Sequence, residues 1–190
     1  MTYPIRTGAA LSALALALGS ASALAQSEIT VAQSSDIRTL DPSVDTSPIS
    51  LNVFQNVYSA LTQIAADGSV EPELATGWTS NEDSTEWTFT LREGVTFHDG
   101  TPLTAEDVVW TYQKIMADEG SPVRAYLSRV DTVEATGDYE VTFTLSAPFA
   151  PWPRQLTLVS ILPSDTYQER GAEAFNTDPV GSGPFRIVSW

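Results

Sequence analysis

Residues 91–108 read LREGVTFHDGTPLTAEDV, and this stretch contains the local signals that decide the fold. The alternation of apolar and polar residues that ends at Phe97 indicates a strand with one buried face. Residues 99–102, Asp-Gly-Thr-Pro, have the composition of a tight turn. Thr104 is suited to cap a helix, and Asp107 completes a Thr-x-x-Asp capping box. The stretch therefore predicts a strand, a turn and a capped helix in immediate succession.

Alternating side chains on both sides of this stretch predict more β-structure. Residues 87–91 alternate apolar and polar side chains, and residues 95–97 resume the pattern after a glycine. Residues 130–136 and 139–145 alternate in the same way around the Gly-Asp pair at 137–138. That arrangement is a β-hairpin signal.

Two helices are predicted from caps and apolar periodicity. The helix capped by Thr104 is expected to end at Gly120, and one of its faces carries Val108, Tyr112 and Ile115. An earlier helix has Ser47 as its N-cap and Pro48 at its first position. Its apolar residues recur at steps of three and four: Leu51, Phe54, Tyr58 and Leu61.

Shorter segments complete the expected order of elements. Residues 28–33 alternate and suggest a short strand, while residues 71–78 read as a connector punctuated by Pro and Gly. Residues 156–162 suit a buried strand, residues 163–170 a short helix closed by the following glycine, and residues 185–189 the start of another strand. This mixture of a hairpin, helices and separated strands favours an α/β or mixed α+β class.

Trp152 differs from the other aromatic residues because prolines surround it. Pro148, Pro151 and Pro153 predict an extended connector here. The indole is either a stacking platform at a ligand cleft or a plug under a loop, and both interpretations stay open. The other large aromatic residues lie on periodic elements and are expected in the core: Trp87, Phe89, Phe97, Trp110 and Phe143.

The first 25 residues have the organisation of a secretory signal peptide. One cation, Arg6, precedes an apolar run over residues 9–18, and residues 23–25, Ala-Leu-Ala, supply a small–x–small cleavage pattern. The run is shorter than the ~20 residues that a membrane span needs. We expect cleavage after Ala25 and, because no Cys is present for acylation, a protein that is not a lipoprotein.

The composition excludes several kinds of chemistry. The chain has 190 residues, a formal net charge of −15 and 42% hydrophobic residues, which suits one ordinary domain with a core. The absence of Cys excludes a disulfide scaffold, a Cys-ligated zinc site and a thiol nucleophile. With one His, a multi-histidine metal site is also excluded, and we expect no cofactor. So acidic a chain repels phosphate backbones, which makes nucleic acid a poor partner.

His98 is the residue through which any Ser-His-Asp triad would run, so a secreted hydrolase centred on it is the catalytic alternative. Asp99 would then orient the imidazole. Against this, residues 97–102 have turn chemistry, and adjacent residues on a strand point to opposite faces. The carboxylate pairs at 82–83 and 106–107 are explained by a solvated turn and by helix capping. A non-transport adhesion or scaffold domain is a second alternative.

Residues 91–108 closely resemble the signature of the family 5 solute-binding proteins of ABC importers, the dipeptide- and oligopeptide-binding group. Three further blocks match in the family's order: residues 40–42 (LDP), residues 73–78 (ELATGW) and residues 180–185 (VGSGPF). Together the four blocks span nearly all of the sequence that follows the expected cleavage point. Four ordered matches are far more specific than one.

The resemblance implies a periplasmic-binding-protein-like fold of type II, in which two lobes close on a solute. Family members are considerably longer, and in them the block at 180–185 marks the return of the chain to the first lobe. We therefore expect an N-terminal fragment, a truncated first lobe with the second lobe absent. Residues 26–58 and 163–190 would then belong to the core of lobe I, and residues 59–162 to an accessory β/α subdomain.

The resemblance also implies the function, which is capture of a solute in the periplasm and its delivery to the permease subunits of an ABC importer. The binding protein itself makes and breaks no bond, and family likeness suggests a monomer. Peptides are the first expectation for the solute. Nickel chelates, oligosaccharides and opine-like compounds stay open within the same family.

Candidate solute-binding residues follow from the position of the family's cleft. The stretch after Leu-Asp-Pro leads into that cleft in the family, which implies that Thr46, Ser47 and Pro48 lie near the solute. Val123 and Thr157 are weaker candidates. Thr46 stands where an oligopeptide binder can carry a charged residue, which argues against recognition of a peptide amine at that point.

Overall fold

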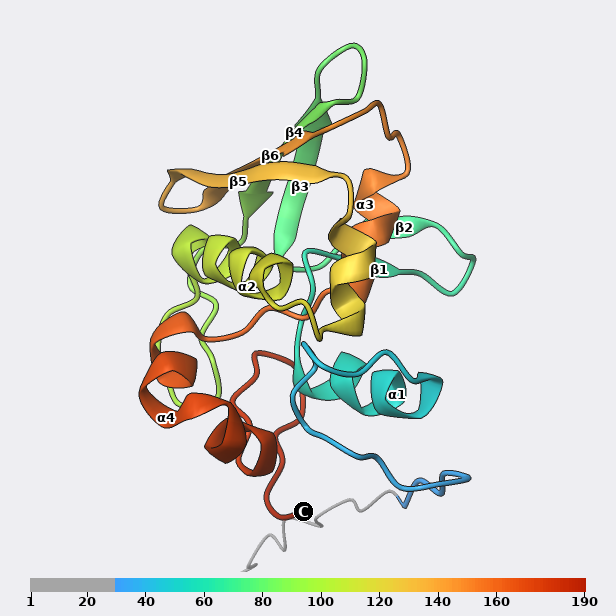
Figure 1. The fold of residues 1–190 in the computed structure, drawn as a ribbon, viewed down its shortest axis with the longest axis vertical. Helices are drawn as coiled ribbons and strands as arrows, with labels where there is room; N and C mark the ends of the chain where they lie inside the picture. Colours follow the sequence, from blue (N-terminus) through green and yellow to red (C-terminus); the bar gives the residue numbers. More distant parts are fainter. Residues whose placement is uncertain (1–29) are drawn as a thin grey trace, which may run out of the picture. The chain divides into compact units, whose positions relative to one another are not determined.

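A four-stranded antiparallel sheet is the largest element of residues 30–190, the part of the chain that the computed structural model describes (Figure 1). Its strands lie in the order β3-β4-β6-β5. Their bounds are Ala75–Ser80 for β3, Glu86–Leu91 for β4, Val130–Gly137 for β5 and Glu140–Leu145 for β6. The predicted strand at 87–91 and the predicted hairpin around Gly137 are therefore confirmed. The predicted signal peptide lies outside the described residues.

Helix α2, Ala105–Ala117, packs against β5 and β6 and covers one face of the sheet (Figure 1). The ring of Tyr112 meets the ring of Phe143 edge-on, with 4.9 Å between their centroids. Phe143 also lies edge-on to Phe89 at 5.7 Å and to Trp152 at 5.4 Å. All four side chains are fully buried, so the core of residues 33–190, which form one compact unit, centres on Phe143.

The carboxylate of Asp107 joins the beginnings of two helices. One oxygen, Oδ2, accepts a hydrogen bond from the backbone N–H of Thr104 at 2.9 Å, as the predicted capping box requires. The other, Oδ1, accepts from the backbone N–H and the hydroxyl of Ser164 at 2.9 and 2.8 Å. Ser164 begins α4, Ser164–Thr177. Asp107 therefore accepts hydrogen bonds from backbone N–H groups at the beginnings of α2 and α4, which have no partner within their own helices.

Helix α4 consists of two helical pieces that meet at Gly171. This residue has a φ of 77°, a left-handed value that Gly adopts without strain. The first piece corresponds to the short helix predicted over residues 163–170. The second piece buries Phe175, whose ring lies 4.6 Å from that of Tyr167, and so extends the core beyond the predicted element.

Helix α1, Pro48–Val57, begins as the sequence predicts, with Ser47 as its N-cap and Pro48 at its first position. It is followed by a small antiparallel hairpin of β1, Thr62–Ile64, and β2, Val70–Pro72. The pair Asp67-Gly68 forms the turn between these two strands, and Gly68 has a φ of 85° there.

Three expectations for the middle of the chain are wrong. The proline-rich segment after β6 is not an extended connector, because α3, Trp152–Gln155, forms there with Pro153 in its first turn, where the missing N–H costs nothing. Residues 156–162 are not a strand; they begin with the 3-10 helix η2, Leu156–Leu158. The connector expected at 71–78 contains β2 and the start of β3, whose register is interrupted by a bulge at Ala75/Gly77.

Other boundaries also differ from the expectations. Helix α2 ends at Ala117, three residues before Gly120, because the backbone leaves the helix at Asp118. The resumed strand at 95–97 forms only one isolated bridge, between Thr96 and Pro102. Residues 30–33 and 185–189 form no strand, and they pair with none of the strands among the described residues.

Trp152 is a plug and not a stacking platform. Its side chain is fully buried, and its indole packs edge-on against Phe143 beneath the sheet. Trp87, Phe89, Phe97 and Phe143 are buried as expected, while Trp110 is half-buried and packs on Tyr167 at 5.3 Å. Within residues 30–190, no helix has the length and apolar character needed to cross a membrane.

Candidate functional site

The Leu-Asp-Pro loop is held by a buried polar network around Asp41. Asp41 is 2% exposed, and its carboxylate accepts hydrogen bonds from the hydroxyl of Tyr167 and from both the N–H and the hydroxyl of Ser43. Burial raises the pKa of Tyr167, and its hydrogen bond to Asp41 raises it further, so this hydroxyl remains a donor. The network fixes the loop that leads to the candidate residues Thr46–Pro48.

A lysine from α2 joins the same network. Lys114 Nζ donates a hydrogen bond to Ser43 Oγ at 2.7 Å and lies 4.7 Å from the centre of the Tyr167 ring. The hydroxyl of Ser121, a residue that follows α2 in the sequence, donates a hydrogen bond to the backbone carbonyl of Ser43. The loop is therefore anchored to α2, to α4 and to the segment that precedes Val123.

Thr46, Ser47 and Pro48 lie at the beginning of α1, with Thr46 and Ser47 half-buried and Pro48 exposed. The carboxylate of Asp45 stabilises this end, because it accepts hydrogen bonds from the hydroxyl of Ser50 at 2.6 Å and from the N–H of Ser47 at 2.8 Å. Burial raises the pKa of Asp45, but these hydrogen bonds outweigh it and hold the pKa below its ordinary value. Asp45 therefore stays ionised at the helix N-terminus.

Val123 lies in the 3-10 helix η1, Pro122–Leu127, and only 2% of it is exposed. The hydrogen bond from Ser121 to Ser43 brings this segment next to the Leu-Asp-Pro loop. The structure thus gathers the loop before Thr46 and the segment of Val123 in one region. Val123 itself packs in the core, and its contact with a solute stays a prediction.

Thr157 belongs to a second feature, which we name the Glu73 hollow. This hollow has a volume of about 200 Å³ and is formed by the end of α1, strand β1, Glu73 and the segment after α3. Its lining residues are Gln55, Tyr58, Ala60, Thr62, Gln63, Ile64, Glu73, Thr157 and Ser160. Sequence reasoning singled out Thr157 and missed Glu73, because no local pattern marks a residue that distant segments enclose.

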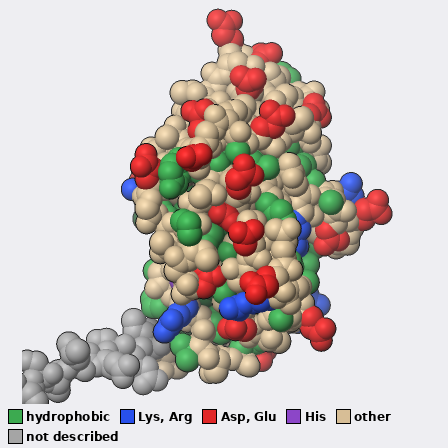
Figure 2. Space-filling view, turned by 90° about the vertical axis from the view of Figure 1, so that its left-hand side faces the viewer, with side chains coloured by type: hydrophobic (Ala, Val, Ile, Leu, Met, Phe, Trp, Pro, Cys, Tyr) green, Lys and Arg blue, Asp and Glu red, His purple; other side chains and the backbone are tan. Residues whose placement is uncertain are grey.

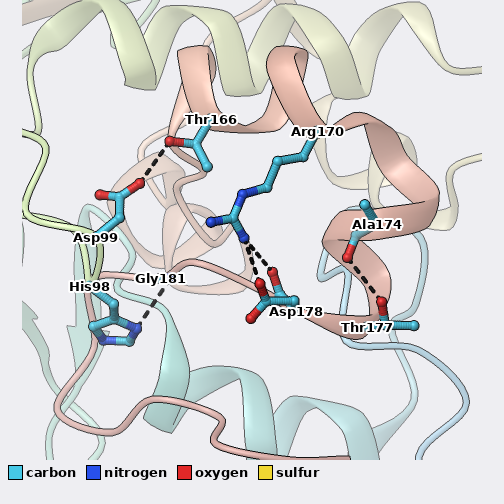
Figure 3. A network of polar contacts seen from close by, with 8 residues as sticks. All are labelled: His98, Asp99, Thr166, Arg170, Ala174, Thr177, Asp178 and Gly181. Atoms are coloured by element: carbon cyan, nitrogen blue, oxygen red, sulfur yellow. Dashed lines mark hydrogen bonds and ion pairs between the residues drawn. The ribbon is translucent and has the colours of Figure 1, made fainter.

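His98 does not form a catalytic dyad with Asp99. Its imidazole bonds to the backbone on both sides: Nε2 lies 2.8 Å from the carbonyl oxygen of Gly183, and Nδ1 accepts from the N–H of Gly181 at 3.3 Å. Asp99 points away, toward the hydroxyl of Thr166 at 2.7 Å (Figure 3). Both ring nitrogens of His98 therefore contact backbone groups of residues 181 and 183.

Acidic side chains are spread over the surface. In Figure 2 carboxylates are scattered across the visible face, with few Lys or Arg side chains between them. The ion pair between Arg170 and Asp178, with 2.9 Å between Nη1 and Oδ2, is the one found within residues 30–190. The excess of acidic over basic residues gives the protein a negative electrostatic potential.

Comparisons with known proteins identify relatives along most of the chain. A family model described as bacterial extracellular solute-binding proteins, family 5 Middle, matches residues 69–190. The probable D,D-dipeptide-binding periplasmic protein DdpA of Escherichia coli K12 is 34% identical over 175 residues, which cover 85% of this chain and 33% of that protein. The chain spans about a third of the length of the curated relatives that it matches.

Solved structures similar to this chain are also those of solute-binding proteins. The oligopeptide-binding protein AppA of Bacillus subtilis, in complex with a nonapeptide, superposes with a TM-score of 0.72 at 28% identity, covering 82% of this chain and 32% of AppA. MoaA of A. tumefaciens R10, in complex with mannopinic acid, gives a TM-score of 0.74 at 31% identity, with 81% and 33% covered. The described residues thus form part of a mixed α/β fold of the type II periplasmic binding proteins.

Proposed function

This chain belongs to the bacterial extracellular solute-binding proteins of family 5, and we propose that it captures solutes in the periplasm for an ABC importer. The family consists of solute-binding proteins and not of enzymes. The observation that carries the proposal is the match over residues 69–190, together with superposition of four-fifths of the chain on binding proteins solved with their solutes. The contacts of His98 with backbone count against the hydrolase alternative.

We infer that peptides are the solutes. DdpA and AppA, by their names, bind dipeptides and oligopeptides, and this chain shares 34% and 28% of its aligned residues with them. MoaA binds a different kind of compound at similar identity, so the solute class depends on the residues that line the cleft and not on the fold. Nickel chelates, oligosaccharides and opine-like compounds are the alternatives that a binding test must include.

We propose that Thr46, Ser47, Pro48, Val123 and Thr157 lie on one wall of the solute cleft. The support is the network around Asp41, which holds the loop before Thr46 against α2 and α4 and so gives this wall a fixed shape. Residues 26–58 and 163–190 would form the core of that lobe, and residues 59–162 an accessory subdomain. Solute that bridges this wall and an opposing one would favour a closed state.

Thermal unfolding of the full-length protein tests the proposal. A ligand that binds only the native state stabilises it by about 2.7 kcal/mol at a concentration 100 times its Kd. Trialanine, a nickel–histidine chelate, maltotriose and mannopinic acid should therefore separate the solute classes. We expect a rise in Tm with trialanine. No rise with any of the four would contradict solute capture, and a rise with another compound alone would contradict peptides.

A pair of substitutions tests the position of the wall. Thr46→Arg places a long side chain beside the proposed cleft and should abolish the stabilisation by trialanine. Thr79→Arg introduces the same side chain on strand β3, where residue 79 is exposed, and should leave the stabilisation unchanged. Equal effects of the two substitutions would contradict a cleft wall at Thr46. Uptake of trialanine by cells that carry the gene, lost on its deletion, tests delivery to a permease.

A further inference from the structure

Several side chains that line the Glu73 hollow carry oxygen atoms that can accept hydrogen bonds. Glu73 Oε2 accepts the N–H of Ala60 at 3.0 Å, and the Ser59 hydroxyl also acts on this carboxylate, which has about four lone-pair sites in all. The side-chain amide N–H of Gln63 donates to the carbonyl of Pro72 at 3.3 Å, so its amide oxygen is available. The Thr157 hydroxyl donates to the carbonyl of Arg154 at 2.9 Å and keeps its own lone pairs.

The charge of Glu73 is not neutralised by a cation within residues 30–190. The nearest guanidinium interaction is that of Arg92, which reaches the backbone carbonyl of Glu73 at 3.5 Å and makes no ion pair with its carboxylate. Tyr58 also lines the hollow, but its hydroxyl donates to the carbonyl of Leu40 at 2.6 Å and remains protonated because burial raises its pKa. Glu73 is therefore the one acidic or basic side chain among the residues that line the hollow.

Burial makes this unpaired charge costly. Loss of water around Glu73 raises the pKa of its carboxyl, and the hydrogen bonds from Ala60 and Ser59 only partly oppose the effect. A cation that entered the hollow would restore to the carboxylate the interactions that it lost with water. A primary ammonium has three N–H donors and no acceptor, which matches a carboxylate, an amide oxygen and a hydroxyl oxygen.

We propose that the Glu73 hollow is a subsite for a cationic nitrogen group, an ammonium or guanidinium, of the solute. This inference rests on the proposed function and names a chemical feature of the solute. At about 200 Å³ the hollow is smaller than the roughly 300–1,000 Å³ of whole-ligand pockets. It therefore receives one end or one side chain of a solute whose remainder lies elsewhere in the cleft.

Matched peptides and matched variants of the full-length protein test this subsite. Trialanine carries its cation at the N-terminus, N-acetyl-Ala-Lys-Ala carries it on a side chain, and N-acetyl-trialanine has none. Comparison of the first two distinguishes the source of the cation. Glu73→Gln keeps the size of the side chain and removes its charge. Glu71→Gln makes the same change at an exposed residue of β2 that lies outside the hollow.

Calorimetric titration should show that Glu73→Gln weakens binding of the preferred cationic peptide by about tenfold, the size expected for loss of a charged hydrogen-bond partner. Binding of N-acetyl-trialanine should be unchanged, and Glu71→Gln should bind every peptide within about twofold of wild type. If the wild type binds the peptides but Glu73→Gln keeps the same preference for the cation, the subsite is refuted while the proposed function stands. If the wild type binds none of the three, both are refuted for peptides.

Discussion

His98 Nε2 lies 2.8 Å from the carbonyl oxygen of Gly183, and the backbone N–H of His98 donates to the carbonyl of Gly181 at 2.8 Å. The strand–turn–helix corner at 91–108 is thereby fixed to a segment from near the far end of the described chain (Figure 3). That segment in turn bonds to the end of α1, because the N–H of Gly183 donates to the carbonyl of Val57 at 2.9 Å. The hydrogen bonds of residues 181–183 therefore link three regions that are distant in sequence.

His98→Ala should lower the stability of the protein without abolishing solute binding. The substitution leaves the carbonyl of Gly183 and the N–H of Gly181 without their side-chain partner, at a cost of about 1–3 kcal/mol in the free energy of unfolding. Urea unfolding measures this loss. Trialanine should still raise the Tm of the variant. Loss of binding with unchanged stability would instead indicate that His98 contacts the solute.

Gly181→Ala should destabilise the protein strongly because a Cβ at this position would overlap the carbonyl of Val57. The neighbouring residue Tyr58 would also lie in contact, at 3.1 Å, so relief requires movement of the backbone. We expect a loss of about 1–3 kcal/mol, as for other overpacked sites. Gly77→Ala is the control, since a Cβ there meets nothing within 4 Å. Comparable stability of the two variants would contradict the close approach at Gly181.

Asp107→Ala should destabilise two helices at once. Each lost cap costs about 1 kcal/mol, so a total near 2 kcal/mol is expected in chemical unfolding. Glu106→Ala is the matched control, because Glu106 is an exposed acidic residue in the same helical turn. A cost for Asp107→Ala no greater than that for Glu106→Ala would argue against the shared cap of α2 and α4.

The pH dependence of stability should reveal the half-buried carboxyl of Glu73. Burial raises its pKa above the ordinary value of 4.5, so the folded protein holds this proton at pH values where the unfolded chain has released it. The contribution of Glu73 to the free energy of unfolding is therefore greatest below pH 4.5. It declines as the pH rises through the pKa of Glu73 in the folded protein. Glu73→Gln cannot ionise and should be more stable than wild type at neutral pH, with the advantage disappearing in acid. A constant difference between the two proteins at all pH values would count against this burial.

Local signals were sufficient to predict the elements whose geometry depends on neighbours in sequence. Ser47-Pro48 predicts the start of α1, Asp107 the start of α2, and Gly137 the hairpin turn. Each signal is a cap or a turn residue with a fixed backbone requirement. The Pro-rich segment at Trp152 was mispredicted because Pro suits the first turn of a helix as well as an extended chain.

Tertiary contacts determined the segments and the hollow that local sequence signals did not predict. The pattern of the apolar run at 156–162 fits a buried strand, but no strand within residues 30–190 pairs with it in the structure. Its residues instead form η2 and an irregular segment. The Glu73 hollow was invisible in the sequence because it joins residue 73 to segments near 60 and 157. Enclosure of the Glu73 carboxylate by distant segments produces no periodic pattern in the sequence. The candidate residues Thr46–Pro48, by contrast, follow the Leu-Asp-Pro motif.

Calorimetric titration of the full-length protein with the peptide that stabilises it most, followed by chromatography of the recovered solute, tests the central claim most directly. Solute capture requires a saturable heat with one solute bound per protein and complete recovery of the intact peptide. Absence of saturable binding by any solute in the panel, or conversion of the peptide into products, would contradict it.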